Sequence, residues 1–558
     1  MGVCKVVQTD RWQADQIVHD LANRKQRWLE VEIPERINYL RRCVVGVQAV
    51  AATWVEVACQ IKGIDPNSNL AGEEWTSGPL TTLANLQQLI QALAANGQPQ
   101  PIDWRTAANG QKIARVFPRT VPEKLLWRGF RAEVWLQPDL PATQGAIYRQ
   151  QTQMGRVALV LGAGNNTAIA PTDSLYKLFA ENQVVLLKMN PVNAAIGPIL
   201  AQAFQPLISA GWWQIVYGGA DLGAYLCQHP EIDTVHITGS HHSHDAIVWG
   251  SDPIQQAERK AAGQPPFTKP ITSELGCVTP ILVVPGPWSA SDLAWQARHV
   301  ASMVAHNASF NCVAGKVLIT ATGWPQRRQF LAQVEQALAR IPPRYAYYPG
   351  AQERYQQFLD RYPQAQPLSA RTETMIPWTL IADLPAQAGE YALVQEAFCG
   401  VLAEVALAAN DAANFLEQAV NFANQTIWGN LSCVVLIHPA TQKRVRVELE
   451  RAIAALRYGN IGINVWTGVG FLLTTTTWGA FPGNPLAEIS SGQGVVHNTY
   501  LFDHPEKSVL SAPFRIFPLP AWFAGHCTLG QLGPILVDYE AAPTWGKLLR
   551  IVSLALRG

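Results

Sequence analysis

One cysteine of the chain lies where a thiol could act as a nucleophile. Cys312 belongs to the stretch HNASFNCVAGK, after small and polar residues and before the strand-like KVLIT. A nucleophilic cysteine needs a thiolate and a nearby oxyanion donor, and no carboxylate adjacent in this stretch would hold the thiol protonated. A buried structural cysteine is the alternative interpretation, because free cysteines are among the most buried residues.

Two polar stretches at the ends of apolar runs could serve such a nucleophile. Glu274 ends the run ITSEL, where partial burial would raise its pKa toward that of a general base. Asn165 and Asn166 follow the run VALVL, where a side-chain amide could face a pocket. A solvated strand-end glutamate and a plain glycine turn are the respective alternatives.

The elements that would position these residues alternate between strand and helix. From residue 157, the apolar runs VALVL, VVLLK, WQIVY and TVHIT are separated by helical stretches, which indicates a parallel sheet of Rossmann type. Gly162 and Gly164 after the first run fit a G-x-G pattern, but Thr167 replaces the third glycine, so this dinucleotide signal is weak. Nucleotide binding at the strand ends is the working hypothesis.

Periodicity also predicts the domain organisation. Residues 10–100 read mainly as helix, and a strand hairpin with its turn at PDLP is expected over about 131–150. We predict an α/β nucleotide-binding domain over 1–270, a second α/β domain over 271–480, and a C-terminal arm and extension over 481–558, where periodicity is weak.

The composition excludes several classes of protein. Lys and Arg number 42 against 41 Asp and Glu, without a basic stripe, so we expect no nucleic-acid partner. Only 15% of residues are charged, which predicts apolar surface hidden in a subunit interface or against a membrane. The nine cysteines form no CxxC pair, and the N-terminal stretch carries charges, so we expect a reducing, cytoplasmic location.

Three histidines cluster in the stretch GSHHSHD. His241, His242 and His244 lack a further Cys or Asp in helical register, so we predict no metal site there. Solvated or phosphate-facing histidines are the better interpretation.

Taken in order, the motifs resemble those of the aldehyde dehydrogenase superfamily. The matching stretches are VVLLKMNP, WQIVYGGADLGAYLCQHPEIDTVHITGS, ITSELGC, NASFNCVAGKVLI, VQEAFCGVL, GNIGINVW, TWGAFPG and SSGQG. The resemblance covers about residues 10–510. It implies an aldehyde dehydrogenase-like α/β fold: a Rossmann-type NAD(P)-binding domain within 1–270, a catalytic domain over 271–480, and an oligomerisation arm that includes the hairpin. A homodimer or homotetramer is implied as well.

The resemblance further implies a role for each matching residue. Cys312 would attack the aldehyde carbonyl, Asn165 and the Cys312 N–H would hold the oxyanion, and Glu274 would activate the water that releases a carboxylic acid. Asn166 stays open as the alternative oxyanion donor. The implied contacts to NAD or NADP are Lys188 at the adenosine ribose, Gly239 and Ser240 at the pyrophosphate, Glu396 at the nicotinamide ribose, and Phe398 nearby.

Three departures from the family pattern bear on the cofactor. Cys277 replaces the second glycine of the ELGG motif and Cys399 the glycine of E-x-F-G-P, so thiols are expected to border the nicotinamide pocket. Pro191 stands where the family acid binds the ribose 2′-hydroxyl, three residues after Lys188. Without that carboxylate, we expect NADP to be accepted at least as well as in acid-bearing members.

Two other functions compete with free-acid formation. In an acyl-CoA reductase or CoA-acylating dehydrogenase, CoA would resolve the thioester, but Glu274 favours water. A catalytically silent nucleotide-binding scaffold is the second alternative, against which the retention of Cys312, Glu274 and an asparagine argues. The apolar stretch VWTGVGFLLTTTTW, 465–478, predicts a medium or long aliphatic or aromatic aldehyde.

The end of the chain shows an amphipathic pattern. In APTWGKLLRIVSLALRG the apolar stripe is Trp545, Leu548, Leu549, Val552 and Leu556, with basic residues off the stripe. We expect this helix to pack on a neighbouring subunit, with peripheral contact to an anionic membrane as the alternative. It is too short and too charged for a spanning segment.

Overall fold

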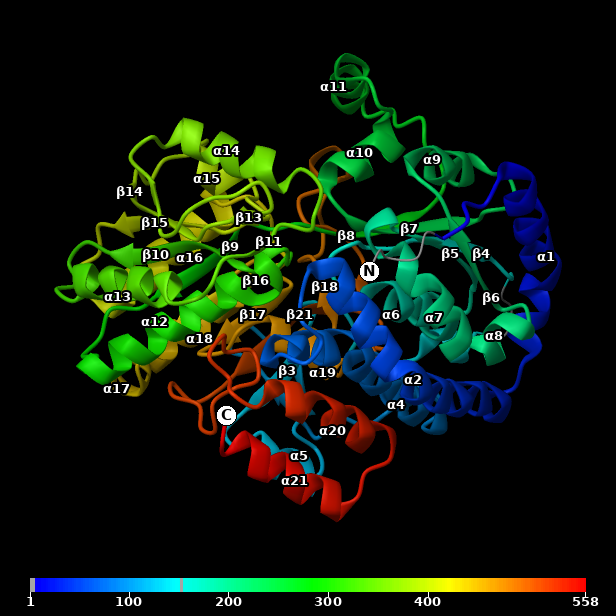
Figure 1. The fold of residues 1–558 in the computed structure, drawn as a ribbon, viewed down its shortest axis with the longest axis horizontal. Helices are drawn as coiled ribbons and strands as arrows, with labels where there is room; N and C mark the ends of the chain where they lie inside the picture. Colours follow the sequence, from blue (N-terminus) through cyan, green and yellow to red (C-terminus); the bar gives the residue numbers. More distant parts are fainter. Residues whose placement is uncertain (1–5, 151–153) are drawn as a thin grey trace.

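The computed structural model describes residues 6–150 and 154–558. In this part of the chain, most strands belong to two large sheets, which form two neighbouring lobes in Figure 1. The helices of residues 33–94 and the last two helices of the chain lie in the centre and lower part of the view, whereas the helix of residues 11–30 lies at its right edge.

The smaller sheet has the strand order β19-β8-β7-β4-β5-β6. Five of its strands, β4 to β8, run parallel. The short strand β19 (Gly492–Gln493) pairs antiparallel with β8, the outermost of these five. The parallel strands are β4 (Val157–Leu161), β5 (Val184–Met189), β6 (Trp213–Tyr217), β7 (Thr234–Gly239) and β8 (Ile271–Leu275). This sheet confirms the predicted Rossmann-type fold, since continuous apolar runs are typical of buried parallel strands.

Helices of this lobe connect the strands and pack on them. They are α1 (Arg11–Glu30), α6 (Ile169–Leu175), α7 (Gly197–Ala203), α8 (Gln205–Ser209), α9 (Ala220–Gln228), α10 (His241–Trp249) and α11 (Pro253–Ala262). A Ser240 side chain caps α10 by accepting a hydrogen bond from the Ser243 N–H, 3.2 Å away. The helix therefore begins directly where β7 ends, as a strand-to-helix ligand site requires.

The larger sheet has the strand order β1-β2-β3-β21-β17-β16-β9-β10-β15-β14-β12. Its central seven strands are parallel: β21 (Pro505–Ser511), β17 (Asn460–Ile463), β16 (Ser432–Leu436), β9 (Thr279–Val283), β10 (Gly315–Ala321), β15 (Val401–Leu407) and β14 (Thr379–Leu384). The antiparallel flanks are β1 (Asp103–Thr106), β2 (Lys112–Phe117), β3 (Arg131–Leu136) and β12 (Gln366–Pro367).

Helices and short strand pairs complete this lobe. The helices are α12 (Ala290–Ala305), α13 (Arg327–Ala339), α14 (Ala351–Arg361), α15 (Tyr391–Val394), α16 (Ala412–Thr426), α17 (Pro439–Arg444), α18 (Arg446–Ala455) and α19 (Gly468–Leu473). Two short antiparallel pairs join β11 (Arg344–Tyr345) to β13 (Met375–Ile376) and β18 (Trp478–Gly479) to β20 (Val495–Val496).

The predicted domain boundaries need correction. The boundary at residue 270 is wrong, because β8 follows it and pairs with β7 in the smaller sheet. The hairpin over 131–150 is also wrong: β3 ends at Leu136 and pairs with β2 and β21. Strands expected in an oligomerisation arm therefore extend the larger sheet of their own chain. Assembly with a second copy stays a prediction.

The N-terminal helices form a layer beside the smaller sheet. They are α2 (Ile33–Lys62), α3 (Gly72–Trp75) and α4 (Thr81–Ala94), and α5 (Val121–Leu126) follows β2. Among the described helices, α2 is the one whose length and apolar composition would suffice to cross a membrane. In the structure α2 packs against α4 and α7.

The C-terminal segment folds back on its own chain instead of extending as an arm. It continues from β21 through a coil to α20 (Leu529–Ala541) and α21 (Trp545–Ala555), which lie beside α5 in Figure 1. The predicted apolar stripe of α21 is confirmed at Leu548 and is wrong at Trp545, Leu549 and Leu556. Leu548, Ile551 and Leu554 are the buried positions, because α20 packs on that side. Trp545, Leu549 and Leu556 of the predicted stripe are 68%, 69% and 54% exposed.

Candidate active site

The loop that carries Cys312 connects α12 to β10 in a strained conformation. Asn307, Ala308 and Ser309 all have left-handed backbone angles, with φ of 53°, 54° and 68°. Such angles are costly for residues other than glycine and persist only where the surroundings enforce them. Lys316, buried at the start of β10, donates to the carbonyl oxygen and hydroxyl of Ser309 at 3.1 and 3.0 Å. This bond fixes the loop from its inner side.

Asn307 joins the nucleophile loop to the turn after β4. Its side-chain N–H group donates to the carbonyl oxygens of Asn165 and Phe310 at 2.9 and 3.1 Å. The Tyr347 hydroxyl lies 2.9 Å from the same Asn165 oxygen and 3.0 Å from Asn307 Oδ1. The predicted oxyanion donor and the predicted nucleophile are thus held in one hydrogen-bonded network.

A buried carboxylate on α3 supports the same network. Glu73 accepts a hydrogen bond from the Asn307 backbone N–H at 3.1 Å and pairs with Arg344 at 3.2 Å. Burial alone would raise the pKa of Glu73, but the Arg344 guanidinium, His306 and the Asn307 N–H together outweigh burial and hold the pKa below its ordinary value. Glu73 therefore stays ionised and remains a strong acceptor for the loop.

Asn165 and Asn166 differ in what their side chains already bind. The Asn165 amide nitrogen donates to the Phe310 carbonyl at 3.0 Å, which leaves its second N–H free of that bond. The Asn166 side-chain oxygen instead accepts from the Ala168 N–H at 2.9 Å and so caps the next turn. Asn165 lines both of the cavities described below, whereas Asn166 lines only one of them. We therefore retain Asn165 as the proposed donor.

Glu274 and Cys312 influence each other's protonation. Burial raises the pKa of Glu274 to about 8, and the nearby Asp173 carboxylate acts in the same direction. Burial also raises the pKa of the Cys312 thiol, and the Glu274 carboxylate adds to this effect. The expectation that no carboxylate holds the thiol protonated is therefore wrong: Glu274 is distant in sequence but adjacent in space. One Glu274 oxygen is buried without a hydrogen-bond partner among the described residues.

A large cavity of about 1120 Å³ lies at the carboxyl ends of the smaller sheet. All five predicted cofactor residues line it: Lys188, Gly239, Ser240, Glu396 and Phe398. Gly276 lets Glu396 approach, because a Cβ atom on Gly276 would lie 1.9 Å from a Glu396 carboxylate oxygen. The cavity, the start of α10 and these polar groups fit a dinucleotide.

The exposure of Cys277, Cys399 and the three histidines of the stretch GSHHSHD shows which of them can face the cofactor cavity. Cys277 and Cys399 are fully buried and line neither cavity, so the expectation that they border the nicotinamide pocket is wrong. His241 and His242 line the cofactor cavity, whereas His244 is buried with its ring 3.3 Å from Asp245. No group of three metal-ligating side chains occurs among residues 6–150 and 154–558.

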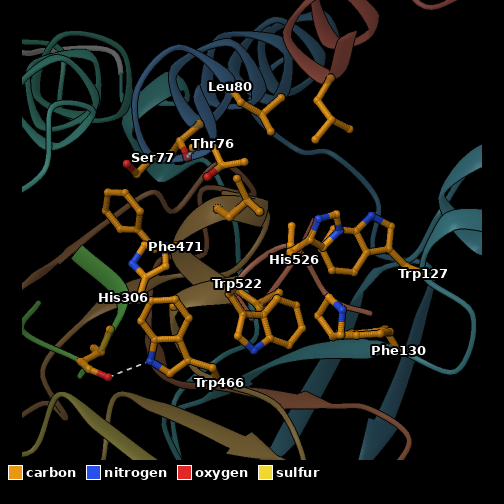
Figure 2. Close-up of a pocket in the computed structure, with 18 of the residues that line it drawn as sticks. Thr76, Ser77, Leu80, Trp127, Phe130, His306, Trp466, Phe471, Trp522 and His526 are labelled. Atoms are coloured by element: carbon orange, nitrogen blue, oxygen red, sulfur yellow. Dashed lines mark hydrogen bonds between the residues drawn. The ribbon is translucent and has the colours of Figure 1, made fainter. Parts of the chain in front are cut away.

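A second, smaller cavity of about 230 Å³ is also lined by Cys312. Figure 2 shows its mainly aromatic and aliphatic lining, with Thr76, Ser77 and Leu80 on one side and Trp466 and Phe471 on another. The Trp466 indole donates to the Val313 carbonyl at 2.8 Å, which fixes this wall to the residue after the nucleophile. We call this cavity the apolar tunnel.

The two cavities meet at a small junction. Four residues line both of them: Asn165, Ile169, Glu274 and Cys312. The structure thus brings together all three predicted catalytic residues at the point where the tunnel reaches the cofactor cavity. Sequence reasoning missed the supporting residues Asn307, Tyr347 and Glu73. Asn307 is visible in the motif itself, five residues before Cys312, but nothing local in the sequence marks the other two.

Comparisons with known proteins agree with this geometry. A model of the aldehyde dehydrogenase family matches residues 139–345. N-succinylglutamate 5-semialdehyde dehydrogenase of Novosphingobium aromaticivorans is 30% identical over 179 residues, which are 32% of this chain and 34% of that protein. The aligned part of the chain thus spans about a third or less of the curated relatives it matches.

Solved structures share the fold across nearly the whole chain. Gamma-glutamyl-gamma-aminobutyraldehyde dehydrogenase from Burkholderia cenocepacia J2315 superimposes with a TM-score of 0.63 and 17% identity, covering 92% of this chain and 91% of that one. NADP-dependent glyceraldehyde-3-phosphate dehydrogenase from Bacillus halodurans C-125, in complex with NADP, gives a TM-score of 0.60 and 17% identity, covering 90% and 92%.

Proposed function

We propose that the chain is a member of the aldehyde dehydrogenase superfamily and that it oxidises an aldehyde to a carboxylic acid with NAD or NADP as acceptor. One observation carries this proposal: an apolar tunnel and a dinucleotide-sized cavity share a junction lined by Cys312, Glu274 and Asn165. An aldehyde that enters through the tunnel would meet the thiol between an oxyanion donor and the cofactor.

The first step forms a bond between Cys312 and the aldehyde carbon. Glu274 lies beside the thiol and, once ionised, can take its proton, so that the thiolate adds to the carbonyl. The carbonyl oxygen gains negative charge, which the Asn165 amide and the Cys312 N–H would stabilise. The product of this step is a thiohemiacetal on Cys312.

Bound NAD or NADP would supply the hydride acceptor that this oxidation requires, so that the product held on Cys312 would be a thioester. Lys188 and Glu396 would hold the ribose groups of the cofactor, and the start of α10 at Ser240 would face the pyrophosphate. Glu274 then releases the thiol proton to solvent. The ionised carboxylate takes a proton from water, the hydroxyl adds to the thioester carbon, and the Cys312 thiolate leaves. The free oxygen of Glu274, buried and without a partner, suits this second role.

Cofactor choice rests on the end of β5. Pro191 lines the cofactor cavity close to Lys188, so no carboxylate from that position faces the ribose 2′ site. We propose that NADP is accepted at least as well as NAD, because the 2′-phosphate meets no repelling charge from this position.

Assembly and location remain proposals as well. We propose a cytoplasmic homodimer or homotetramer, supported by the low charged fraction of 15% and by the exposed Trp545, Leu549 and Leu556 on α21. A second copy is the preferred partner of this exposed face, and an anionic membrane is the alternative. Leu549→Lys should lower the mass in solution; an unchanged mass with lost liposome binding would favour the membrane.

The test of the proposed reaction uses purified protein, a panel of aldehydes and either cofactor, without CoA. The expected result is NAD(P)H formation with release of one carboxylic acid per turnover. Strict dependence on CoA would support the CoA-acylating alternative instead. Nucleotide binding without any turnover would support the silent scaffold.

A further inference from the structure

The C-terminal segment, residues 512–558, forms the outer wall of the apolar tunnel. This segment lies beyond the stretch that resembles the family and beyond the matched residues 139–345. It nevertheless supplies a large share of the tunnel lining, including Ile516, Leu519, Trp522, His526, Leu532 and Ile551. Figure 2 places Trp522 and His526 opposite the wall formed by Leu80 and Thr76.

The C-terminal segment is docked too closely to be a loose tail. A Cβ atom on Gly533 would lie 2.5 Å from the Trp75 side chain, so α20 needs a glycine there to reach α3. The two last helices are tied together by the Thr528 hydroxyl, which donates to the Leu554 carbonyl at 2.9 Å. Arg515 pairs with Asp292 on α12 at 2.7 Å. The tunnel wall is therefore part of the folded core.

The lining of the tunnel sets the chemistry of what it accepts. Among the described residues, Arg128 is the one fully charged cation in the lining, and Glu274 is the one carboxylate. Arg128 is exposed and Phe517, also in the lining, is 80% exposed, so these two residues mark where the tunnel opens to solvent. Between this opening and Cys312 the walls are mainly aromatic and aliphatic. A charged aldehyde would lose its hydration there without compensation.

We infer that residues 512–558 form the substrate-selecting wall of the enzyme and that the substrate is a long, unbranched, uncharged aldehyde. Its carbonyl lies at Cys312, and its apolar chain runs along Trp522, Leu532 and Ile551. This inference rests on the proposed function and names the substrate class of the same site. Each methylene buried along the wall contributes about fourfold to kcat/KM, whereas a short aldehyde leaves the outer lining unfilled.

The test uses a substitution in residues 512–558 that makes the tunnel narrower. Ile551→Trp places a larger side chain in the lining. Leu549→Trp is the matched control, because Leu549 lies on the same helix outside the lining and tryptophan keeps the apolar character of its exposed face. Both variants and the unchanged protein are assayed with unbranched aldehydes from propanal to tetradecanal. For Ile551→Trp we expect the kcat/KM of the longest aldehydes to fall about tenfold or more, with propanal unchanged within about twofold. Leu549→Trp should keep the original profile.

A binding measurement separates this inference from the proposed reaction. Titration with the methyl ester of cis-parinaric acid, an uncharged fluorescent long-chain probe, needs no turnover, and Ile551→Trp should weaken its binding about tenfold while Leu549→Trp does not. If no aldehyde is oxidised, the proposed function fails, but this titration still decides the inference. A folded Ile551→Trp protein with unchanged binding and an unchanged chain-length profile would overturn it. If Ile551→Trp does not fold, Ile551→Ala replaces it, and an optimum that fails to move to longer aldehydes counts against the inference.

Discussion

The two cavities that meet at Cys312 are built in different ways. The cofactor cavity lies at the ends of sequential parallel strands, and its contacts Lys188 and Gly239 directly end apolar runs. The apolar tunnel is enclosed by residues far apart in the chain, among them Trp127, Trp466 and Trp522. Local pattern is sufficient to locate the first cavity, whereas long-range packing determines the second.

Because the two cavities bind different molecules, substitutions in them should have different effects on activity. A change on the cofactor side should affect every aldehyde alike, because the dinucleotide is common to all turnovers. A change in the tunnel should discriminate among aldehydes and leave cofactor binding untouched. Residues at the junction belong to both sides, so their substitution should affect all substrates most strongly.

The largest effect is expected at the nucleophile. Cys312→Ser should lower kcat/KM for every aldehyde by roughly 10⁴-fold, because the hydroxyl is a far weaker nucleophile at neutral pH. Binding of NADPH, followed by energy transfer from tryptophan, should stay within about twofold, since one atom is exchanged. Undiminished turnover in this variant would show that another group forms the covalent bond.

Asn307 should have the next largest effect, although it does not touch the reacting atoms. Asn307→Ala removes the bonds that hold Asn165 to the nucleophile loop, and we expect kcat to fall about 10²-fold with little change in the cofactor KM. Tyr347→Phe removes only the hydroxyl contacts and should give a smaller loss. A lower Tm with unchanged kcat in both variants would limit Asn307 to a structural role.

A change at Pro191 should act on the cofactor side alone. Pro191→Asp restores a carboxylate near Lys188 and should lower kcat/KM with NADP about tenfold relative to NAD, through repulsion of the 2′-phosphate. Pro191→Ala serves as the uncharged control. The ratio should be the same for short and long aldehydes. Strict NAD selectivity of the unchanged protein would contradict this account of the cofactor cavity.

The pH dependence should show the smallest but most diagnostic change. Glu274 acts as a base only when ionised, so kcat/KM should rise with pH through about 8, the raised pKa of this carboxyl. Asp173→Asn removes a negative neighbour that disfavours the ionised form, and its inflection should therefore move to lower pH. Profiles recorded with a short and a long aldehyde should coincide. An inflection unmoved by Asp173→Asn would remove Asp173 as a cause.

The sequence predicts the cofactor side of the fold better than the tunnel side. Strand runs such as VALVL and VVLLK are buried on both sides and need no distant partner to be recognised. The hairpin over 131–150 fails because β3 takes β21, which follows more than three hundred residues later, as its partner. The stripe of α21 fails in part for the same reason, since α20 decides which side is buried.

For the site as well, the sequence predicts residues within motifs but not the neighbours that the fold brings to them. Cys312, Glu274 and Asn165 stand in recognisable stretches, and the structure brings them to one junction. The support by Glu73 and the raised pKa of Cys312 depend on elements that meet only in the folded chain. Spacing within a motif contains no information about such neighbours.

The central claim is that Cys312 carries the substrate as a thioester where the two cavities meet. Glu274→Gln lacks the base for both steps, but it also removes the negative charge that helps to raise the pKa of Cys312, so the thiolate should still form the thioester at mildly alkaline pH. Hydrolysis should be slow, because the amide cannot accept a proton from water. The variant is incubated with dodecanal and NADP at mildly alkaline pH, quenched in acid, and digested for mass spectrometry. We predict a dodecanoyl group on the peptide that contains Cys312, formed only when the cofactor is present. An unmodified Cys312 peptide, or an acyl group on another residue, would contradict the account.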